Sequence, residues 1–322
     1  MKRHDQILLG ALIVQVILII FVFWPQKPGS AAGEPVFPDL DANDVVAVSI
    51  TDDVGSRIFL RQETGQWVLP GADDYPAAGD KVVALLEKLA QLSTGRLVTR
   101  TDASHKPLQV SPDQFMRRIQ LELADGSVRI LYLGSSPSYG AMHFRVEGRN
   151  ETYLTDEITV WDASTTVTSW VDVVYQQLAQ DEITAMVLEN AQGRFAFTRD
   201  EAGDWTMDGL AADEVLNDTQ VATLLRQATT VSLVRPLGRE PEPAYGMDGP
   251  NAVVTLERAG GTVTLSVGAK SPEDNTYVVR SSESPYYVRV AEYGVSALVE
   301  NGREDFIQLP PTPTPEGAEG DS

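Results

Sequence analysis

The chain has 322 residues, about twice the usual length of one domain, so two folded domains are expected. It carries 46 acidic and 25 basic residues, which gives a formal charge of −21. This excess argues against nucleic acid as a partner, because phosphate backbones are bound by Lys and Arg. The absence of cysteine excludes disulfides, thiolate metal sites and a cysteine nucleophile.

Residues 7–24 read ILLGALIVQVILIIFVFW, an uncharged stretch with a single amide side chain. As a helix rising about 1.5 Å per residue it would span about 27 Å, close to the roughly 30 Å hydrocarbon core of a bilayer. Lys2 and Arg3 precede the stretch, and only Lys27 follows it before an acidic run. The positive-inside rule then places residues 1–6 in the cytoplasm. The sequence therefore predicts a single-pass cell-membrane protein, held in the lipid bilayer by 7–24, with its bulk extracytoplasmic.

Cleavage of this N-terminal segment as a signal peptide is the alternative. Ser30-Ala31-Ala32 offers the small residues that a signal peptidase prefers. The apolar run is longer than the usual 7 to 15 residues of a signal core, which favours retention. Cleavage near Ala32 would instead release a secreted chain that begins near Gly33.

The rest of the chain contains a long internal repeat. RQETGQWVL at 61–69 corresponds to RDEAGDWTM at 199–207, so the two tryptophans lie 138 residues apart. In the same order and at similar spacing, VVALL at 82–86 corresponds to VATLL at 221–225, LYLGSSP at 131–137 to LSVGAKSP at 265–272, and Tyr153 to Tyr287. Repeats of this length indicate tandem domains rather than a solenoid.

Both copies follow one predicted order of elements. In the first we expect strands at 45–51 and 57–61, a Trp-bearing strand, a helix at 80–91, a hairpin at 119–123 and 128–133, and strands at 142–146 and 152–154. In the second we expect strands at 183–189 and 194–199, a helix at 218–227, a hairpin at 253–256 and 263–267, and strands at 277–280 and 286–290. This order predicts an α+β fold of mainly antiparallel strands with one main amphipathic helix in each copy.

These patterns set the domain boundaries. We expect a linker at 25–44, a first repeat domain at 45–179, a second at 180–308 and a disordered Pro-rich, acidic tail at 309–322. The join between the two repeats is short.

The arrangement resembles a bacterial family, the domain of unknown function 4340. The motifs that carry the resemblance are Gly65-Gln66-Trp67, Leu131-Tyr132-Leu133-Gly134 and Tyr153, together with their second-copy equivalents, across about residues 45–306. The resemblance implies an extracytoplasmic accessory subunit that works beside an ABC-type permease and an auxiliary envelope protein of the gliding-motility type. It implies no catalytic residues.

No motif in the chain indicates chemistry. The three histidines, His4, His105 and His143, are accompanied by no Gly-x-Ser-x-Gly elbow, and no P-loop occurs. The acidic run at 39–44 lacks the Gly and the late Glu of a calcium loop. We therefore expect a non-enzymatic protein with no catalytic, cofactor-binding or metal-binding residue and no cofactor.

Four aromatic residues are candidates for a ligand or partner surface: Trp161, Trp170, Tyr286 and Tyr287. They motivate an alternative function, an extracytoplasmic glycan- or peptide-binding module. A third hypothesis is a hydrolase that uses two facing carboxylates, a geometry that sequence spacing does not test. The favoured hypothesis is an accessory or scaffold protein of an ABC-type transport system.

Overall fold

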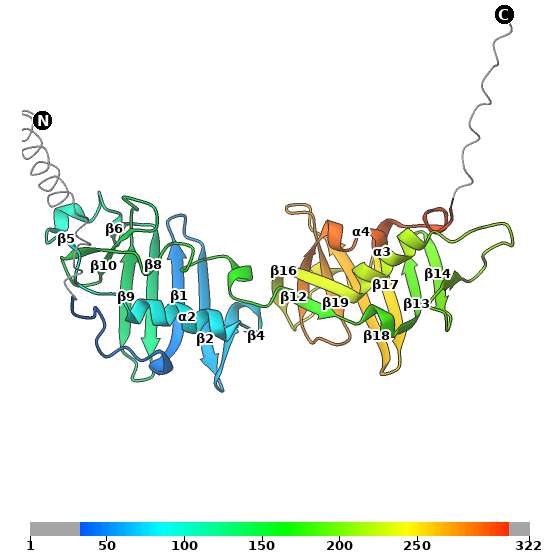
Figure 1. The fold of residues 1–322 in the computed structure, drawn as a ribbon, viewed down its shortest axis with the longest axis horizontal. Helices are drawn as coiled ribbons and strands as arrows, with labels where there is room; N and C mark the ends of the chain where they lie inside the picture. The colour runs from blue at the N-terminus through cyan, green and yellow to red at the C-terminus, as the bar shows by residue number, and fades with distance from the viewer. Residues whose placement is uncertain (1–32, 309–322) are drawn as a thin grey trace, which may run out of the picture. The chain divides into compact units, whose positions relative to one another are not determined.

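A computed structural model of the protein describes residues 33–308 (Figure 1). The predicted anchor at 7–24, the predicted cleavage site near Ala32 and the predicted tail at 309–322 lie outside these residues. Within 33–308, none of the helices combines the length and the apolar character that crossing a bilayer requires.

The first sheet has nine strands. From one edge to the other they are β4 (Tyr75–Pro76), β3 (Gln66–Leu69), β2 (Arg57–Glu63), β1 (Val45–Asp52), β8 (Arg117–Leu123), β9 (Val128–Leu133), β10 (Met142–Val146), β11 (Thr152–Thr155) and β5 (Leu97–Thr99). Antiparallel pairing joins β4 to β3, β3 to β2, and β8 through β9, β10 and β11 to β5. A separate two-stranded ribbon consists of β6 (Val110–Ser111) and β7 (Gln114–Phe115).

The second sheet also has nine strands, and all its neighbours are antiparallel. Their order is β12 (Val174–Gln177), β16 (Thr230–Gly238), β20 (Tyr287–Ala291), β19 (Thr276–Ser281), β18 (Gly261–Lys270), β17 (Ala252–Arg258), β13 (Ile183–Asn190), β14 (Gly193–Arg199) and β15 (Trp205–Met207). The prediction of mainly antiparallel sheets with few helices is confirmed.

In the described part of the chain, three α-helices accompany the sheets: α2 (Gly79–Ala90), α3 (Asp218–Thr229) and α4 (Ser296–Glu300). Short 3₁₀ turns are η1 (Ala42–Asp44), η2 (Pro70–Ala72), η3 (Asp102–Ser104), η4 (Val167–Ser169), η5 (Gln180–Glu182), η6 (Pro243–Tyr245), η7 (Glu292–Gly294) and η8 (Arg303–Phe306). The two predicted amphipathic helices correspond to α2 and α3. Their apolar positions at helical spacing are buried: Val82, Leu85, Leu86 and Leu89 in α2, and Val221, Leu224 and Leu225 in α3.

Helix α3 shows how local sequence and packing agree in the second sheet. Asn217 is its N-cap, and its side-chain oxygen accepts the backbone N–H of Gln220 at 3.4 Å. The helix packs on α4, β16 and η8, and α4 contacts β13 and β17. Next to it, the fully buried ring of Phe306 lies 5.5 Å from that of Phe195 and 5.0 Å from that of Phe197. These contacts build the apolar core on one face of the second sheet.

By the density of their contacts, the described residues form two compact units. The first contains 33–45, 50–56 and 83–163. The second contains 46–49, 57–82 and 164–308. The second unit therefore contains β2, β3, β4 and the whole second sheet. Strand β12 belongs to this sheet although it precedes residue 180, where the sequence predicts the second repeat to begin.

Some details differ from the prediction. Helix α2 runs from Gly79 to Ala90, one residue earlier at each end than the predicted 80–91. Strands β5, β12 and β16 are not predicted from the sequence, and β16 follows α3 without a gap. Trp67 is buried as expected of a core residue, whereas Trp205 is half-buried beneath the guanidinium of Arg199, 6.0 Å from its ring centre.

Candidate functional site

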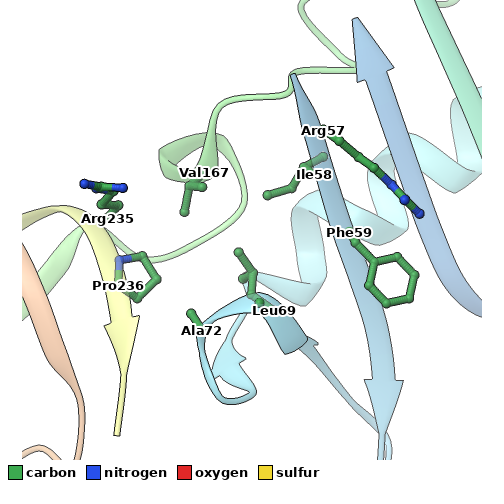
Figure 2. Close-up of a pocket in the computed structure, with 9 residues that line it drawn as sticks. Arg57, Ile58, Phe59, Leu69, Ala72, Val167, Arg235 and Pro236 are labelled. Carbon is green, nitrogen blue, oxygen red and sulfur yellow. The ribbon is translucent and has the colours of Figure 1, made fainter. Parts of the chain in front are cut away.

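A largely apolar hollow lies in the second compact unit (Figure 2). It has a volume of about 590 Å³ and is open to solvent on one side. Strand β2, the turns η2 and η4, and strand β16 surround it; η2 contacts both β2 and β16, and η4 contacts β16. Its lining residues are Arg57, Ile58, Phe59, Leu69, Gly71, Ala72, Val167, Arg235 and Pro236. A hollow of this size falls within the usual range of ligand pockets, about 300–1,000 Å³.

The floor of the hollow is apolar. Ile58, Leu69, Ala72 and Pro236 are buried, and Val167 is half-buried. In Figure 2 the side chains of Ile58, Leu69 and Val167 point toward the space between them. Water in such a space makes few hydrogen bonds, so its displacement by an apolar group is favourable.

The rim carries an exposed ring and two cations. Phe59 is 36% exposed, and Arg57 and Arg235 are exposed. In Figure 2 the side chains of Arg57 and Phe59 point away from the space that Ile58 faces. The guanidinium of Arg57 lies 5.7 Å from the centre of the Phe59 ring, and its Nε donates to the hydroxyl of Ser49 at 2.7 Å. Arg235 approaches a carboxylate oxygen of Asp274 at only 4.0 Å. Such an exposed and distant ion pair leaves the guanidinium able to bind another anion.

The local sequence explains why these residues meet the hollow. Alternation along β2 buries Ile58 and turns Arg57 and Phe59 outward. Pro70 opens η2, and Asp73 ends it in the left-handed conformation with φ 52°. Along β16 the pairing with β20 shifts register on both sides of Pro236, which has no N–H for a regular ladder. This irregularity in β16 places the apolar ring of Pro236 at the floor of the hollow.

A polar network lies next to the hollow, at the end of η2. A carboxylate oxygen of Asp73 accepts the backbone N–H of Arg239 at 2.7 Å. The hydroxyl of Tyr286 accepts from Arg239 Nη2 at 2.6 Å and donates to the backbone oxygen of Asp74 at 3.0 Å. This hydrogen bond to Tyr286 raises the pKa of the Arg239 guanidinium. The network fixes the turn that supplies one wall of the hollow.

The tyrosine rings of this network pack on one another. The rings of Tyr75 and Tyr286 meet edge to face with centres 4.7 Å apart, and Tyr175 donates its hydroxyl proton to the Tyr286 backbone oxygen at 2.7 Å. Burial, with smaller contributions from Tyr175, Asp172 and Tyr286, raises the pKa of Tyr75 to about 12. The hydroxyls of Tyr175 and Tyr286 are engaged in hydrogen bonds within the protein.

The structure places the four aromatic residues singled out from the sequence in different surroundings. Trp170, Tyr286 and Tyr287 are buried, with 2%, 8% and 3% of their surface exposed. Trp170 Nε1 donates to Ser164 O at 2.8 Å, and the Tyr287 hydroxyl accepts from Arg280 at 2.7 Å. These three rings are packing elements and present no open face to a ligand.

Trp161 is the exception, with 85% of its surface exposed. It lies in the first compact unit, whereas the other three lie in the second. Because three of the four rings are buried, the four do not form one exposed aromatic surface for a glycan.

The two histidines within residues 33–308, His105 and His143, take part in local hydrogen bonds. His143 lies in β10, and its Nδ1 is 2.8 Å from the backbone oxygen of Ser135 and 3.1 Å from its hydroxyl. The same hydroxyl donates to Leu108 O at 3.2 Å, so it is not aligned as a nucleophile. His105 Nε2 lies 2.9 Å from the backbone oxygen of Asn150. Neither histidine forms the base-and-orienter arrangement of a triad.

The acidic residues considered as cation ligands serve as caps and turns. Asp41 caps η1 by accepting the backbone N–H of Asn43 at 2.9 Å. Among the described residues, four carboxyl groups have clearly shifted pKa values, and all are lowered: Asp125, Asp162, Glu214 and Asp274. A general acid requires the opposite shift. Within 33–308, no three His, Asp or Glu side chains are grouped so as to hold a metal ion.

Sequence reasoning missed the residues that line the hollow. The alternation of a predicted strand places Arg57 and Phe59 at outward positions, and Pro236 indicates an interruption of a strand. Their meeting with Val167 depends on contacts between segments more than 60 residues apart, for which the sequence offers no local signal.

Comparison with known proteins gives one match. The sequence profile of the domain of unknown function DUF4340 matches residues 67–244, more than half of the chain. No curated protein and no solved structure shows significant similarity. The matched range begins at Trp67, one of the motif residues that carry the resemblance, and the chain therefore belongs to the DUF4340 family.

Proposed function

We propose that this protein is a membrane-anchored, extracytoplasmic accessory or scaffold protein, non-enzymatic, that binds partner proteins of an ABC-type transport system. The observation that carries the proposal is the open apolar hollow of about 590 Å³, with Phe59 exposed at its rim. Exposed apolar surface in a concave site is typical of binding sites for other molecules. Partners on this view include a permease and auxiliary envelope proteins, as in gliding-motility systems.

The proposed location depends on the sequence before the described residues. The apolar stretch at 7–24 has the length of a membrane-spanning helix, and the basic residues favour the cytoplasmic side before it. On this proposal the sheets lie outside the cytoplasm, where an accessory subunit meets the extracytoplasmic parts of a permease. Secretion after cleavage near Ala32 is the alternative.

We further propose that the two sheets descend from one duplicated unit. Read along the chain, β1, β2, β3, β5, β8, β9, β10 and β11 occupy the same places in the first sheet as β13, β14, β15, β16, β17, β18, β19 and β20 in the second. The helices α2 and α3 also occur at the same point of this order. Strands β4 and β12 are the additions. An experimental structure in which these eight strands failed to superpose would contradict the duplication.

Affinity purification from native membranes tests the function. The full-length chain with a tag after Ser322 would be crosslinked gently, purified and analysed by mass spectrometry, beside a Val167→Glu variant. A matched control is Val54→Glu, because Val54 is 81% exposed and lies outside the hollow. Circular dichroism would verify that each variant is folded.

We expect the unmodified chain and the Val54→Glu chain to recover an ABC-type permease with its ATPase, and Val167→Glu to lose them. A carboxylate at this half-buried position would face any apolar partner group in the hollow, which is unfavourable. Recovery of no envelope protein by the unmodified chain would show that the accessory function is wrong. Equal recovery by Val167→Glu would show that partners bind elsewhere.

A further inference from the structure

A second, polar hollow lies on the second sheet, within the second compact unit. Its volume of about 310 Å³ is at the lower end of the usual range of ligand pockets. The lining combines one cation with hydroxyl side chains and contains no carboxylate: Thr264, Ser266, Arg280, Ser281, Ser282 and Ser284. In a chain with 46 acidic and 25 basic residues, a site of this composition suits an anion.

The first sheet has an arginine at the corresponding place, and there it is covered. Strand β10 has the place in the first sheet that β19 has in the second. Arg145 in β10 lies opposite Tyr132, as Arg280 in β19 lies opposite Ser266. Arg145 is 4% exposed, its guanidinium lies 4.8 Å from the centre of the Tyr132 ring, and its Nη2 lies 3.3 Å from the Glu147 carboxylate. A ring and a carboxylate therefore cover this arginine.

Small hydroxyl side chains replace both covering groups in the second sheet. Ser266 stands at the position of Tyr132. Ser282 stands at the position of Glu147, two residues after the arginine in each case. Both serines line the polar hollow beside Arg280. The second sheet thus has open space at the positions that a ring and a carboxylate fill in the first.

The guanidinium of Arg280 is held from its other side. It lies 4.7 Å from the centre of the Tyr287 ring, and its Nη1 donates to the Tyr287 hydroxyl at 2.7 Å. The acid closest to it along the chain, Glu283, pairs instead with Arg258 at 2.8 Å. Arg280 is exposed, so a fixed cation faces the hollow without a carboxylate in the lining. A planar guanidinium of this kind binds a carboxylate through two N–H groups.

Hydroxyl groups surround the place for a ligand. Thr264 and Ser266 alternate with buried residues of β18, so both are on the same face of the strand. Ser282 Oγ accepts the backbone N–H of Thr264 at 3.0 Å, which leaves its own proton to be donated elsewhere. Because the lining contains no aliphatic or aromatic side chain, a ligand rich in hydroxyl groups fits better than an apolar one.

We propose that the polar hollow binds a sugar acid, whose carboxylate takes the place at Arg280 that the Glu147 carboxylate has at Arg145. The carboxylate pairs with the guanidinium, and the sugar hydroxyls exchange hydrogen bonds with the serine and threonine hydroxyls of the lining. The ligand is a uronate, free or as part of an acidic polysaccharide. The site goes beyond the proposed accessory function and shares no lining residue with the apolar hollow.

Isothermal titration calorimetry of the full-length chain in nanodiscs of neutral lipid tests the proposal. The probes are D-galacturonate and its linear trimer, which distinguish a free sugar acid from a polysaccharide. D-galactose lacks the carboxylate, succinate has carboxylates without sugar hydroxyls, and inorganic phosphate is a different oxyanion. Each probe is titrated at low and at high salt.

Three substitutions test the residues. Arg280→Gln removes the cation, Ser282→Glu supplies an internal carboxylate as in the first sheet, and Ser266→Tyr fills the space with a ring. Arg194→Gln and Thr198→Glu are matched controls for the loss of a cation and the gain of an acid, because both residues are exposed on β14 and outside the lining. Circular dichroism verifies that each variant is folded.

We expect galacturonate to bind at least tenfold more tightly than galactose, and its binding to weaken as salt rises. Hydrogen bonds to a charged group have a strength that implies a loss on the order of tenfold in Arg280→Gln and in Ser282→Glu. Ser266→Tyr should also weaken binding, and the two controls should leave it unchanged. A trimer that binds much more tightly than the monomer assigns the site to a polysaccharide, and equal affinities assign it to the free sugar acid.

Three outcomes would overturn the proposal. The first is galactose binding as tight as that of galacturonate, and the second is an unchanged dissociation constant in both Arg280→Gln and Ser282→Glu. The third is the absence of galacturonate binding: if succinate or phosphate then binds, the hollow is a site for another anion, and if no probe binds, it is no anion site.

Discussion

A carboxylate oxygen of Asp73 accepts a 2.7 Å hydrogen bond from the backbone amide of Arg239, a residue 166 positions later in the chain. A second, longer bond of 3.4 Å comes from the amide of Glu240. The contact holds the end of η2 against the end of β16, the two elements that form one side of the apolar hollow. Its integrity therefore controls the shape of the candidate site as well as local stability.

Replacement of Asp73 by Ala is expected to lower the free energy of unfolding by about 1–2 kcal/mol. The change removes the acceptor for two amides and places Ala in a left-handed conformation that Asp tolerates better. Asp73→Asn keeps an acceptor and favours the same backbone, so it should remain within ~0.5 kcal/mol of the unmodified protein. Urea unfolding followed by tryptophan fluorescence measures both, and an Asn variant as unstable as the Ala variant would contradict the hydrogen-bond argument.

Gly238 faces the same carboxylate, and its replacement by Ala should be more damaging. The added methyl carbon would lie 2.4 Å from the Asp73 oxygen, on a backbone with φ +117° that favours Gly. We expect Gly238→Ala to cost about 2–3 kcal/mol. In the double variant with Asp73→Ala the clash is absent. The double variant should therefore cost about 1 kcal/mol less than the sum of the two single costs. Strict additivity in a double-mutant cycle would show that the clash does not occur.

The Tyr286 hydroxyl links Arg239 to the backbone oxygen of Asp74 within this network. Tyr286→Phe keeps the ring against Tyr75 but removes both hydrogen bonds, and we expect a loss of about 1–2 kcal/mol in unfolding free energy. The matched control is Tyr139→Phe, since Tyr139 is fully exposed and its hydroxyl is solvated. Differential scanning calorimetry of the two variants checks this, and equal midpoints would assign the Tyr286 hydroxyl no structural role.

Much of the fold could be predicted from the sequence because its signals are local. The hairpin of β8 and β9 follows from Asp125-Gly126: Gly126 has φ 80°, and Asp125 accepts the amide of Ser127 at 2.8 Å. The helices α2 and α3 follow from the spacing of their leucines and valines. In each case the pattern lies within about a dozen residues, which is the range over which turn chemistry and periodicity act.

Strand β16 shows where such signals end. Helix α3 runs to Thr229 and the strand begins at Thr230, with no Gly or other turn residue between them. Pro236 also argues against a strand when the sequence is read alone, because proline is disfavoured inside a ladder. Pro236 lies between two register shifts, where regular pairing with β20 is already interrupted. This arrangement depends on tertiary structure and cannot be seen in the sequence.

Three of the four aromatic candidates, Trp170, Tyr286 and Tyr287, are buried, and the sequence does not reveal this for a related reason. A tyrosine or tryptophan in a polar stretch fits both an exposed binding surface and a buried ring with one polar contact. Tyr286 and Trp170 are of the second kind, since each buries its ring and retains one or more hydrogen bonds. The hollow itself depends on β2, η4 and β16 meeting, which no local pattern encodes.

The ion pair of Glu214 with Arg303 should produce a stability change in acid. Two hydrogen bonds of 2.8 and 2.6 Å join the carboxylate to the guanidinium, and they lower the pKa of Glu214 from 4.5 to about 2. Because the folded-state pKa is depressed, the contribution is fully present above pH 4.5 and is lost as the pH falls from about 4.5 to 2.

We expect the urea midpoint of Glu214→Gln to vary less with pH across this window than that of the unmodified protein. The exposed neighbour Glu304 provides the control substitution Glu304→Gln. A carboxyl titration by NMR that placed Glu214 near 4.5 would contradict the bidentate pairing.

Tyr75 should produce the opposite effect in alkali. Burial is the main cause that raises its pKa from 10.0 to about 12, and the neighbouring Tyr175, Asp172 and Tyr286 add to it. The folded protein therefore holds this proton more tightly than the unfolded chain does. Its contribution to stability is complete below pH 10 and is lost as the pH rises from 10 to about 12.

Tyr75→Phe has no proton to lose at this position, so its stability should fall less steeply than that of the unmodified protein between pH 10 and 12. Ultraviolet difference titration at 295 nm should show one tyrosine fewer ionising in the late phase, near pH 12. If Tyr75→Phe instead removed a tyrosine that ionises near pH 10, Tyr75 would be solvated, and its edge-to-face contact with Tyr286 at 4.7 Å would not persist in solution.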